Sequence, residues 1–305
     1  MIGPTGPAAQ KRRRPRGFAP WKPDAESLEL VDRVRDVLDL FRAHLPVTIR
    51  QVFYRLVATI GFPKDESSYA RLCETLNRAR RSGLVAWDSF RDDGFTRKAA
   101  PSWESSADWA DDIVASAVGF RLDRQLGQSR RLVVWCEAGG MVPQLYRVAR
   151  EYSVPVFSSG GFDSVTAKHD VAQELAGMGE TTVLHVGDLD PSGVHMFGSL
   201  DEDVRAFLAG MDADCRVEFV RLAVTREQVD RLDLETSPPK KSDKRSFDGD
   251  TVQCEAIPPD ELARILRRAI LERIDTATLD SVLADEHDQR ERLRERATEF
   301  RETLR

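Results

Sequence analysis

Apolar residues recur at every third or fourth position along three segments of the first hundred residues. This spacing predicts amphipathic helices, each with one face turned toward a core. The first helix is predicted at residues 27–42, and the second begins after Thr48 as its N-cap. The third is predicted to begin at Ser67 or Ser68 and to end at Gly83. Together they predict a small helical domain.

A short apolar run at residues 84–87 follows the third helix and predicts a strand. Three helices and a strand-like wing are typical of a winged helix-turn-helix domain, predicted at residues 24–100, although any three-helix bundle shows a similar pattern. Residues 1–23 predict a flexible basic tail. Basic side chains lie off the apolar stripe of the third helix. The predicted DNA contacts are Arg71, Arg78, Arg80 and Arg81, with a solvated helix face as the alternative.

From about residue 130 the pattern changes to apolar runs of strand length that alternate with helical segments. Strands are predicted at residues 132–136, 154–157, 182–186 and 216–224. Alternation of this kind predicts a parallel sheet covered by helices, so the fold class is α/β. The predicted sheet domain spans residues 130–258, after a linker at residues 101–129. Residues 259–305 are predicted as a C-terminal helical appendage that serves packing or dimerisation.

Charge is distributed unevenly along the chain. The whole sequence has a formal net charge of −6, from 45 Lys and Arg against 51 Asp and Glu. Residues 1–100 hold 19 basic and 12 acidic residues, a balance of +7, which leaves 26 and 39, or −13, for the rest. A basic N-terminal third is typical of a segment that binds the phosphates of nucleic acid. The acidic average therefore does not argue against a DNA partner.

Two further features limit the class of protein. The four cysteines, at positions 73, 136, 215 and 254, show no metal-knuckle spacing, so we expect no zinc site and a reducing compartment. No apolar run has the roughly 18 residues that a membrane span needs, and the N-terminus lacks the apolar segment of a secretory signal. We expect a cytoplasmic, nucleoid-associated protein with no membrane partner.

Carboxylates follow two of the predicted strands. Glu137 comes directly after the first, and Asp188 and Asp190 come after the third. Open α/β sheets bind their ligands at the carboxyl ends of strands. Two aspartates spaced by two on extended backbone point the same way, and Mg²⁺ prefers such oxygen ligands. The alternative is an ordinary turn in which aspartate caps the next helix. The combination favours a site for Mg²⁺, with Mn²⁺ as a substitute, held by Glu137, Asp188 and Asp190.

This arrangement resembles the Toprim fold of topoisomerases, primases and some nucleases, and implies a Toprim-like domain. The run Asp188-Leu189-Asp190-Pro191-Ser192-Gly193 resembles the DxDPxG motif of the topoisomerase VI A subunit and the related meiotic double-strand-break protein. The stretch from Gly160-Gly161 to Thr166-Ala167-Lys168 is similar to another segment of that family, which implies a DNA contact at Lys168. The resemblance also implies that Glu137 binds the metal and shuttles a proton.

The same family carries a catalytic tyrosine in its winged helix. Arg50-Gln51-Val52-Phe53-Tyr54 resembles that motif, although Gln51 replaces its usual acidic residue. Arg50 and Tyr54 are four apart, so they share a helix face. The resemblance implies that Tyr54 attacks a phosphodiester, with Arg50 favouring the phenolate and holding the phosphate. The alternative for Tyr54 is a ring that packs at the edge of the apolar stripe.

These features predict a homodimeric protein that cleaves double-stranded DNA with Mg²⁺ and a tyrosine nucleophile, like the topoisomerase VI A subunit. The chain shows no ATPase motif, so strand passage requires a separate ATPase B-like subunit. One alternative is a Toprim nuclease that uses metal-activated water. Another is a non-catalytic winged-helix DNA-binding protein. Glu255 is interpreted as a solvated loop carboxylate rather than a further ligand.

Overall fold

The computed structural model describes residues 18–91, 99–158, 165–239, 245 and 247–304. Its contacts divide the chain into two compact units, Met1–Arg91 and Asp92–Arg305. The second unit joins three segments that the sequence predicts separately: the linker at residues 101–129, the sheet domain and the C-terminal helices. The predicted tail at residues 1–23 falls mostly outside the described residues.

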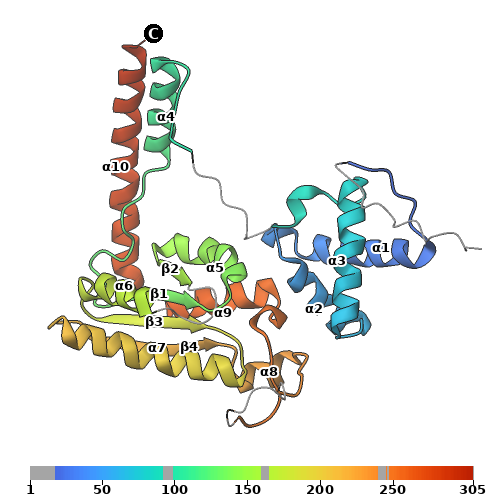
Figure 1. Ribbon diagram of the computed structural model, residues 1–305. Coiled ribbons are helices and arrows are strands. Elements are labelled where there is room, and N and C mark those ends of the chain that lie inside the picture. Colours follow the sequence, from blue (N-terminus) through green and yellow to red (C-terminus); the bar gives the residue numbers. More distant parts are fainter. Residues whose placement is uncertain (1–17, 92–98, 159–164, 240–244, 246, 305) are drawn as a thin grey trace, which may run out of the picture. The chain divides into compact units, whose positions relative to one another are not determined.

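The N-terminal unit contains α1 (Ala25–Leu40), α2 (Ile49–Ile60) and α3 (Glu66–Arg81) (Figure 1). Their buried faces include Val34, Val52 and Leu76, as the apolar spacing predicts. Thr48 caps α2 as predicted, and its hydroxyl accepts the backbone N–H of Gln51 in a reciprocal capping box. The predicted cap of the third helix is wrong. Asp65 takes that place, because its carboxylate accepts the backbone N–H of Ser68.

The segment after α3 is not the predicted strand. Residues 84–86 are irregular and lead into a 3₁₀ turn, Trp87–Ser89. In the described part of this unit, β-pairing is limited to one isolated bridge between Val47 and Phe90. The Arg80 guanidinium lies 4.5 Å from the centre of the Trp87 ring and donates to the Trp87 carbonyl. This contact holds the segment against α3 in place of a strand ladder.

The second unit is built on a parallel sheet, which confirms the predicted α/β class. Its strands are β1 (Arg131–Cys136), β2 (Val156–Ser158), β3 (Thr181–Val186) and β4 (Val217–Ala223). They lie in the order β2-β1-β3-β4, and every neighbouring pair is parallel (Figure 1). β1 and β3 are central and buried on both faces, so they read as continuous apolar runs.

Helices cover both faces of the sheet. The covering helices are α5 (Val142–Ala149), α6 (Val165–Ala176), α7 (Pro191–Gly210), α8 (Arg226–Leu232) and α9 (Pro259–Leu271). One core joins Val134 and Leu184 of the strands to the buried faces of α5 and α9. The other joins Trp135 to α6 and α7. Successive strand residues alternate between these cores because their side chains point to opposite faces.

Two helices extend away from the sheet. α4 (Ser106–Val118) lies within the segment predicted as a linker, and α10 (Thr276–Glu302) is the long C-terminal helix. They run antiparallel along each other, and the distal end of this pair projects beyond the sheet layers (Figure 1). Glu286, buried on α10, accepts from Leu122 N and pairs with Arg124 at 2.8 Å. This pairing anchors the base of the projecting helices.

The strand order places a topological switch point between β1 and β3. The chain passes from β1 to β2 on one side and from β3 to β4 on the other, so the connecting segments diverge where the carboxyl ends of β1 and β3 meet. Ligands of open α/β sheets bind at such a switch point. Across the described residues, no helix is long and apolar enough to cross a membrane.

Candidate metal-binding site

Glu137 is the first residue after β1 and lies buried at the switch point. Its Oε2 accepts the backbone N–H of Asp188 at 3.0 Å, which joins the ends of β1 and β3. Its Oε1 is buried without a hydrogen-bond partner. The nearest ring nitrogen, His185 Nε2, is 3.5 Å from Oε1, and burial lowers the pKa of His185, so the imidazole is neutral. This carboxylate oxygen is thus buried beside a neutral ring, without a hydrogen bond of normal geometry.

Two glycines make room for this carboxylate. A Cβ at Gly187 would lie 2.8 Å from His185 Cε1 and closer still to Glu137 Oε2. A Cβ at Gly193 would lie 3.1 Å from Glu137 Oε2 and would overlap the Asp188 carbonyl oxygen. Both glycines therefore allow the backbone to approach the Glu137 side chain more closely than any other residue would.

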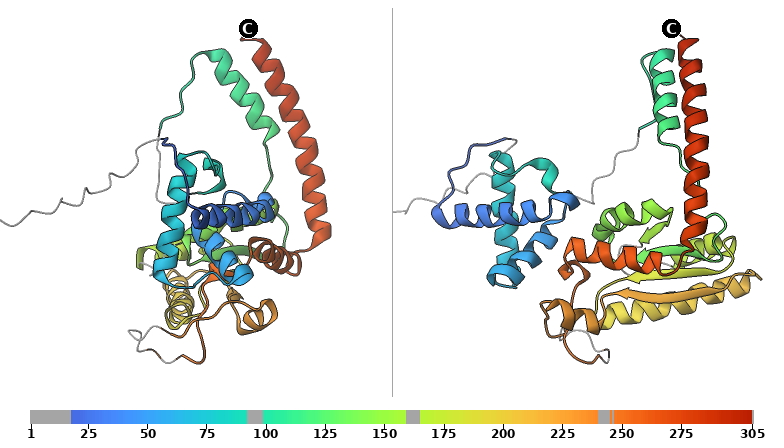
Figure 2. Two further views of the ribbon diagram at one scale, coloured as in Figure 1. Left: turned by 90° about the vertical axis from the view of Figure 1, so that its right-hand side faces the viewer. Right: turned by 180° about the vertical axis from the view of Figure 1, so that it is seen from behind.

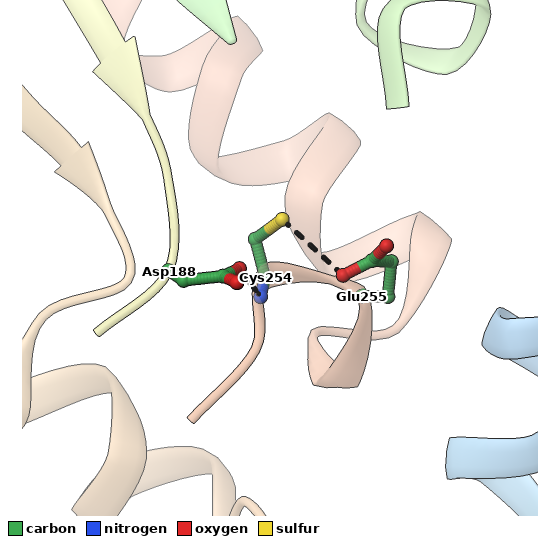
Figure 3. Close-up of side chains that lie close together, drawn as sticks. All are labelled: Asp188, Cys254 and Glu255. Carbon is green, nitrogen blue, oxygen red and sulfur yellow. Dashed lines mark hydrogen bonds between the residues drawn. The ribbon is translucent and has the colours of Figure 1, made fainter. Parts of the chain in front are cut away.

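Asp188 meets an unexpected partner from the segment before α9. Its carboxylate Oδ1 accepts the backbone N–H of Cys254 at 2.8 Å. Ligand atoms of Asp188, Cys254 and Glu255 all lie within 4.8 Å of one another (Figure 3). Glu255, interpreted from the sequence as a solvated loop carboxylate, is half-buried and lies beside Asp188 and Cys254. The turn Cys254–Ala256 brings it to the site from a distant part of the sequence.

Asp190 has a structural duty at the same place. It is the N-cap of α7, and its Oδ1 accepts the backbone N–H of Gly193 at 2.7 Å. Asp190 thus caps the next helix, as the turn interpretation of the aspartate pair expects. Its negative charge also raises the pKa of Asp188. Within the described residues, the close ligand cluster combines Asp188 with Glu255 rather than with Glu137 and Asp190.

Burial and crowding of negative charge set the ionisation of these groups. Burial raises the pKa of Asp188 to about 6, with further contributions from the charges of Glu255 and Asp190. Burial also raises the pKa of the Cys254 thiol, so this sulfur is protonated at neutral pH. The carboxylates of Asp188 and Glu255 offer oxygen ligands, the donor type of Mg²⁺ and Mn²⁺.

Arg221 on β4 is the cation built into this region. Its guanidinium donates to the carbonyl oxygens of Gly187, Asp188, Gly193 and Val224. Those bonds fasten the loop that carries both aspartates to the end of β4. Its charge also acts on the carboxylates of Glu137, Asp188 and Asp190, which raise its pKa against the larger, lowering effect of burial. A single arginine in an apolar strand was the sequence signal available for this role.

The residues fit a divalent cation. Glu137 carries a buried oxygen without a partner, Asp188 and Glu255 crowd their charges together, and the chain's own cation, Arg221, donates to main-chain carbonyls. A divalent ion would relieve the repulsion between the carboxylates. Asp188 and Glu255 are the residues best placed to hold it. Glu137 and Asp190 border the site through the hydrogen bonds that shape the Asp188 loop.

Tyr54 and Arg50 lie in the other unit. Tyr54 is 8% exposed, and its ring packs edge-on against Phe53 at 5.5 Å between centroids. Lys64 Nζ lies 5.5 Å from the Tyr54 ring centre, whereas the Arg50 guanidinium lies 5.6 Å from the ring of Tyr69. The alternative of a packed ring thus describes Tyr54 well, and a lysine lies over this ring.

The predicted DNA-contacting arginines differ in what they do. Arg71 pairs with Glu26 at 2.7 Å and Arg78 with Glu74 at 2.9 Å, both on the solvated surface. Arg81 makes a local hydrogen bond, in which its Nε donates to Asn77 Oδ1. Arg80 packs on the Trp87 ring. Surface pairs of this kind contribute little and can be exchanged for phosphate, whereas the stacked Arg80 has a structural role.

The expected DNA contact at Lys168 does not agree with the structure. Lys168 is buried between α6 and α7, and its Nζ lies 2.6 Å from Asp203 Oδ2 and 2.7 Å from Ser199 Oγ. A lysine committed to these partners joins two helices rather than reaching a phosphate. The Gly160-Gly161 part of the same stretch lies outside the described residues.

Comparison of the chain with protein-family models, with curated proteins and with solved structures found no match. The chemistry of the site therefore has to be argued from its own geometry.

Proposed function

We propose that this protein cleaves the phosphodiester backbone of DNA with a divalent metal ion held at Asp188 and Glu255. The observation that carries the proposal is the meeting of these two carboxylates beside the switch point of the sheet, where Glu137 Oε2 accepts the backbone N–H of Asp188. Oxygen-only sites of this kind select hard divalent cations, whose usual substrates carry phosphate. Under this proposal the sheet unit is a Toprim-like domain and the N-terminal unit a winged-helix DNA grip.

The residues of the site and the basic residues of the N-terminal unit have distinct tasks in this scheme. Asp188 and Glu255 hold the ion, and Glu137 holds the Asp188 backbone through its Oε2. Arg221 keeps the aspartate loop attached to β4. When bound, Mg²⁺ supplies positive charge for the transition state of phosphodiester cleavage and lowers the pKa of a coordinated water. Arg71 and Arg78 exchange their surface glutamates for DNA phosphates, which orients the duplex.

Tyr54 is the nucleophile of the leading scheme. Its Oη gives up its proton to solvent and attacks phosphorus, a 5′-phosphotyrosyl bond forms, the bond from phosphorus to O3′ breaks, and the O3′ oxygen takes up a proton from solvent. Lys64 Nζ lies 5.5 Å from the centre of the Tyr54 ring and is a cation near the nucleophile. Strand passage would then need a separate ATPase B-like subunit. Burial of the Tyr54 ring favours a second candidate, hydrolysis by water at the same carboxylates.

Cleavage of supercoiled plasmid with Mg²⁺ or Mn²⁺ tests the proposal. We expect nicked or linear DNA that disappears with Asp188→Asn and with Glu255→Gln, but persists with Glu174→Gln, which alters an exposed carboxylate on α6. Calorimetric titration with Mn²⁺ in the absence of DNA should show the same order of loss. Cleavage and Mn²⁺ binding that survive both site variants would refute the metal site.

The nucleophile is identified in the same reactions. Protein–DNA adducts that resist denaturation and vanish in Tyr54→Phe would establish the tyrosine. The matched control is Tyr146→Phe, an exposed ring on α5. Cleavage that leaves free 5′-phosphate ends and survives Tyr54→Phe would establish hydrolysis by water. DNA binding without any cleavage would leave a non-catalytic DNA-binding protein.

A further inference from the structure

The projecting pair of helices forms what we call the distal arm: α4 together with residues 290–304, the end of α10 and the turn that follows it (Figure 2). The N-terminal part of α10 is covered by the body of the unit, where Leu279, Val282 and Glu286 are buried. Beyond residue 290, only Ala297 is buried among the described residues of α10. Two helices alone leave part of their apolar seam open, because each has only one neighbour.

The open seam on α10 follows a regular repeat. Leu293, Ala297, Phe300 and Leu304 are spaced by four, three and four residues, the repeat of a helix that packs in a coiled coil or bundle. Ala297 is covered by the antiparallel α4, yet Leu293 is 42% exposed, Phe300 39% and Leu304 37%. One neighbouring helix has therefore covered only part of the seam.

α4 adds aromatic surface at the same place. The Trp109 ring packs edge-on against Phe300 at 5.9 Å between centroids, and 41% of Trp109 is exposed. Trp103 is also half exposed, and its indole N–H donates to Asp112 on α4. These five large side chains leave roughly 400 Å² of apolar surface open, at about 200 Å² for each full side chain. That lies within the roughly 300–600 Å² of the largest apolar patch on a typical monomer, a patch that often has a function.

The two helices of the arm differ in charge, so that α4 of one copy complements α10 of another. α4 carries Asp108, Asp111 and Asp112 and no lysine or arginine. Residues 290–302 of α10 hold five arginines and four glutamates, a balance of +1, and Arg296 and Arg301 lie next to apolar positions of the seam. Arg301 faces Asp111 of its own chain at 3.5 Å and closes one edge of the helix pair. Arg296 is paired only locally, with Glu299, and its side chain is 81% exposed.

We propose that the distal arm binds the distal arm of a second copy of this chain, so that the two helix pairs form a four-helix bundle. A two-fold arrangement sets the acidic α4 of each copy beside the arginines of its partner's α10 and covers both aromatic patches. A homodimer interface buries about 800 Å² on each partner, of which roughly 65% is apolar. The open surface of the arm supplies most of that apolar share.

Light scattering on a size-exclusion column tests the proposal with the full chain. We expect twice the monomer mass of 34.3 kDa for the wild type. The double variant Leu293→Glu with Phe300→Glu should elute as a monomer with unchanged helical content, because both side chains are exposed within one chain. The matched control changes two exposed leucines off the arm, Leu126→Glu with Leu271→Glu, and should remain a dimer.

A charge exchange tests the pairing of the two arms. Arg296→Asp and Asp112→Arg should each weaken the dimer alone, because each sets like charges opposite one another. An equimolar mixture of the two should dimerise again, because opposite charges then face each other at both edges. A monomeric wild type, a dimer that survives the double variant on the arm, or a mixture that stays monomeric would overturn the proposal. None of these results depends on DNA cleavage.

Discussion

Replacement of Gly187 by alanine probes the packing of the acidic site most directly. The added Cβ would lie 2.8 Å from His185 Cε1 and closer to the carboxyl group of Glu137, within a buried region that cannot expand freely. Either the methyl group strains the strand end, or the Glu137 carboxylate moves away from the Asp188 backbone N–H that it now accepts at 3.0 Å.

Both outcomes lower stability. Overpacking of a well-filled core costs about 1–3 kcal/mol, and loss of a buried hydrogen bond to a charged group costs about 1.5–3 kcal/mol. Movement of Glu137 relieves the overpacking but breaks the hydrogen bond, so the two costs do not add in full. We therefore expect a loss of about 3 kcal/mol in unfolding free energy. For a unit of this size that lowers the Tm by roughly 6–12 °C. Mn²⁺ should also bind more weakly, because the Asp188 loop is displaced.

Urea denaturation and calorimetric Mn²⁺ titration measure these effects. Gly198→Ala is the matched control, because Gly198 lies inside α7 and a Cβ there meets nothing within 4 Å. That change should raise stability by about 0.5–1 kcal/mol through helix propensity. If Gly187→Ala were as stable as the wild type and bound Mn²⁺ equally well, the close approach of Glu137 to the Asp188 loop would be refuted.

Three further predictions concern the charged groups of the second unit. Hydrogen bonding from Arg124 lowers the pKa of Glu286, so this pair stabilises the fold above the unfolded pKa of about 4.3 and loses its effect as pH falls through the lower folded value. Glu286→Gln should cost about 3 kcal/mol at pH 7 and flatten the acid limb of a stability–pH curve; an unchanged limb would contradict this. Arg221→Lys keeps the charge but cannot span four carbonyls, so unfolding free energy should fall by about 2 kcal/mol, with a smaller Tm rise on adding Mn²⁺; equal melting curves would be the opposing result. Lys168→Met should leave DNA affinity unchanged in gel-shift titrations, because Lys168 is paired with Asp203; weaker binding would restore the sequence-based expectation.

The sequence alone determined the features that depend on local periodicity. Alternation of apolar strand runs with helical segments predicted the parallel sheet, and β1 and β3 gave continuous apolar runs since central parallel strands are buried on both faces. Thr48 as the cap of α2 was equally readable, because a capping residue acts within one helical turn. Placement of Glu137 and Asp188 at strand ends also followed from the sequence.

Only the tertiary structure decided which groups meet. Glu255 is distant in sequence from Asp188 and has no periodic signal, so its place in the cluster depends on the turn before α9. The sequence placed Lys168 on a helix where it could contact DNA, but in the fold α7 packs against it and buries it. The segment after α3 had the composition of a strand, but strand pairing needs a neighbour, and the stacking of Arg80 on Trp87 holds it instead. Local patterns fix single elements, whereas contacts between distant residues depend on how those elements pack.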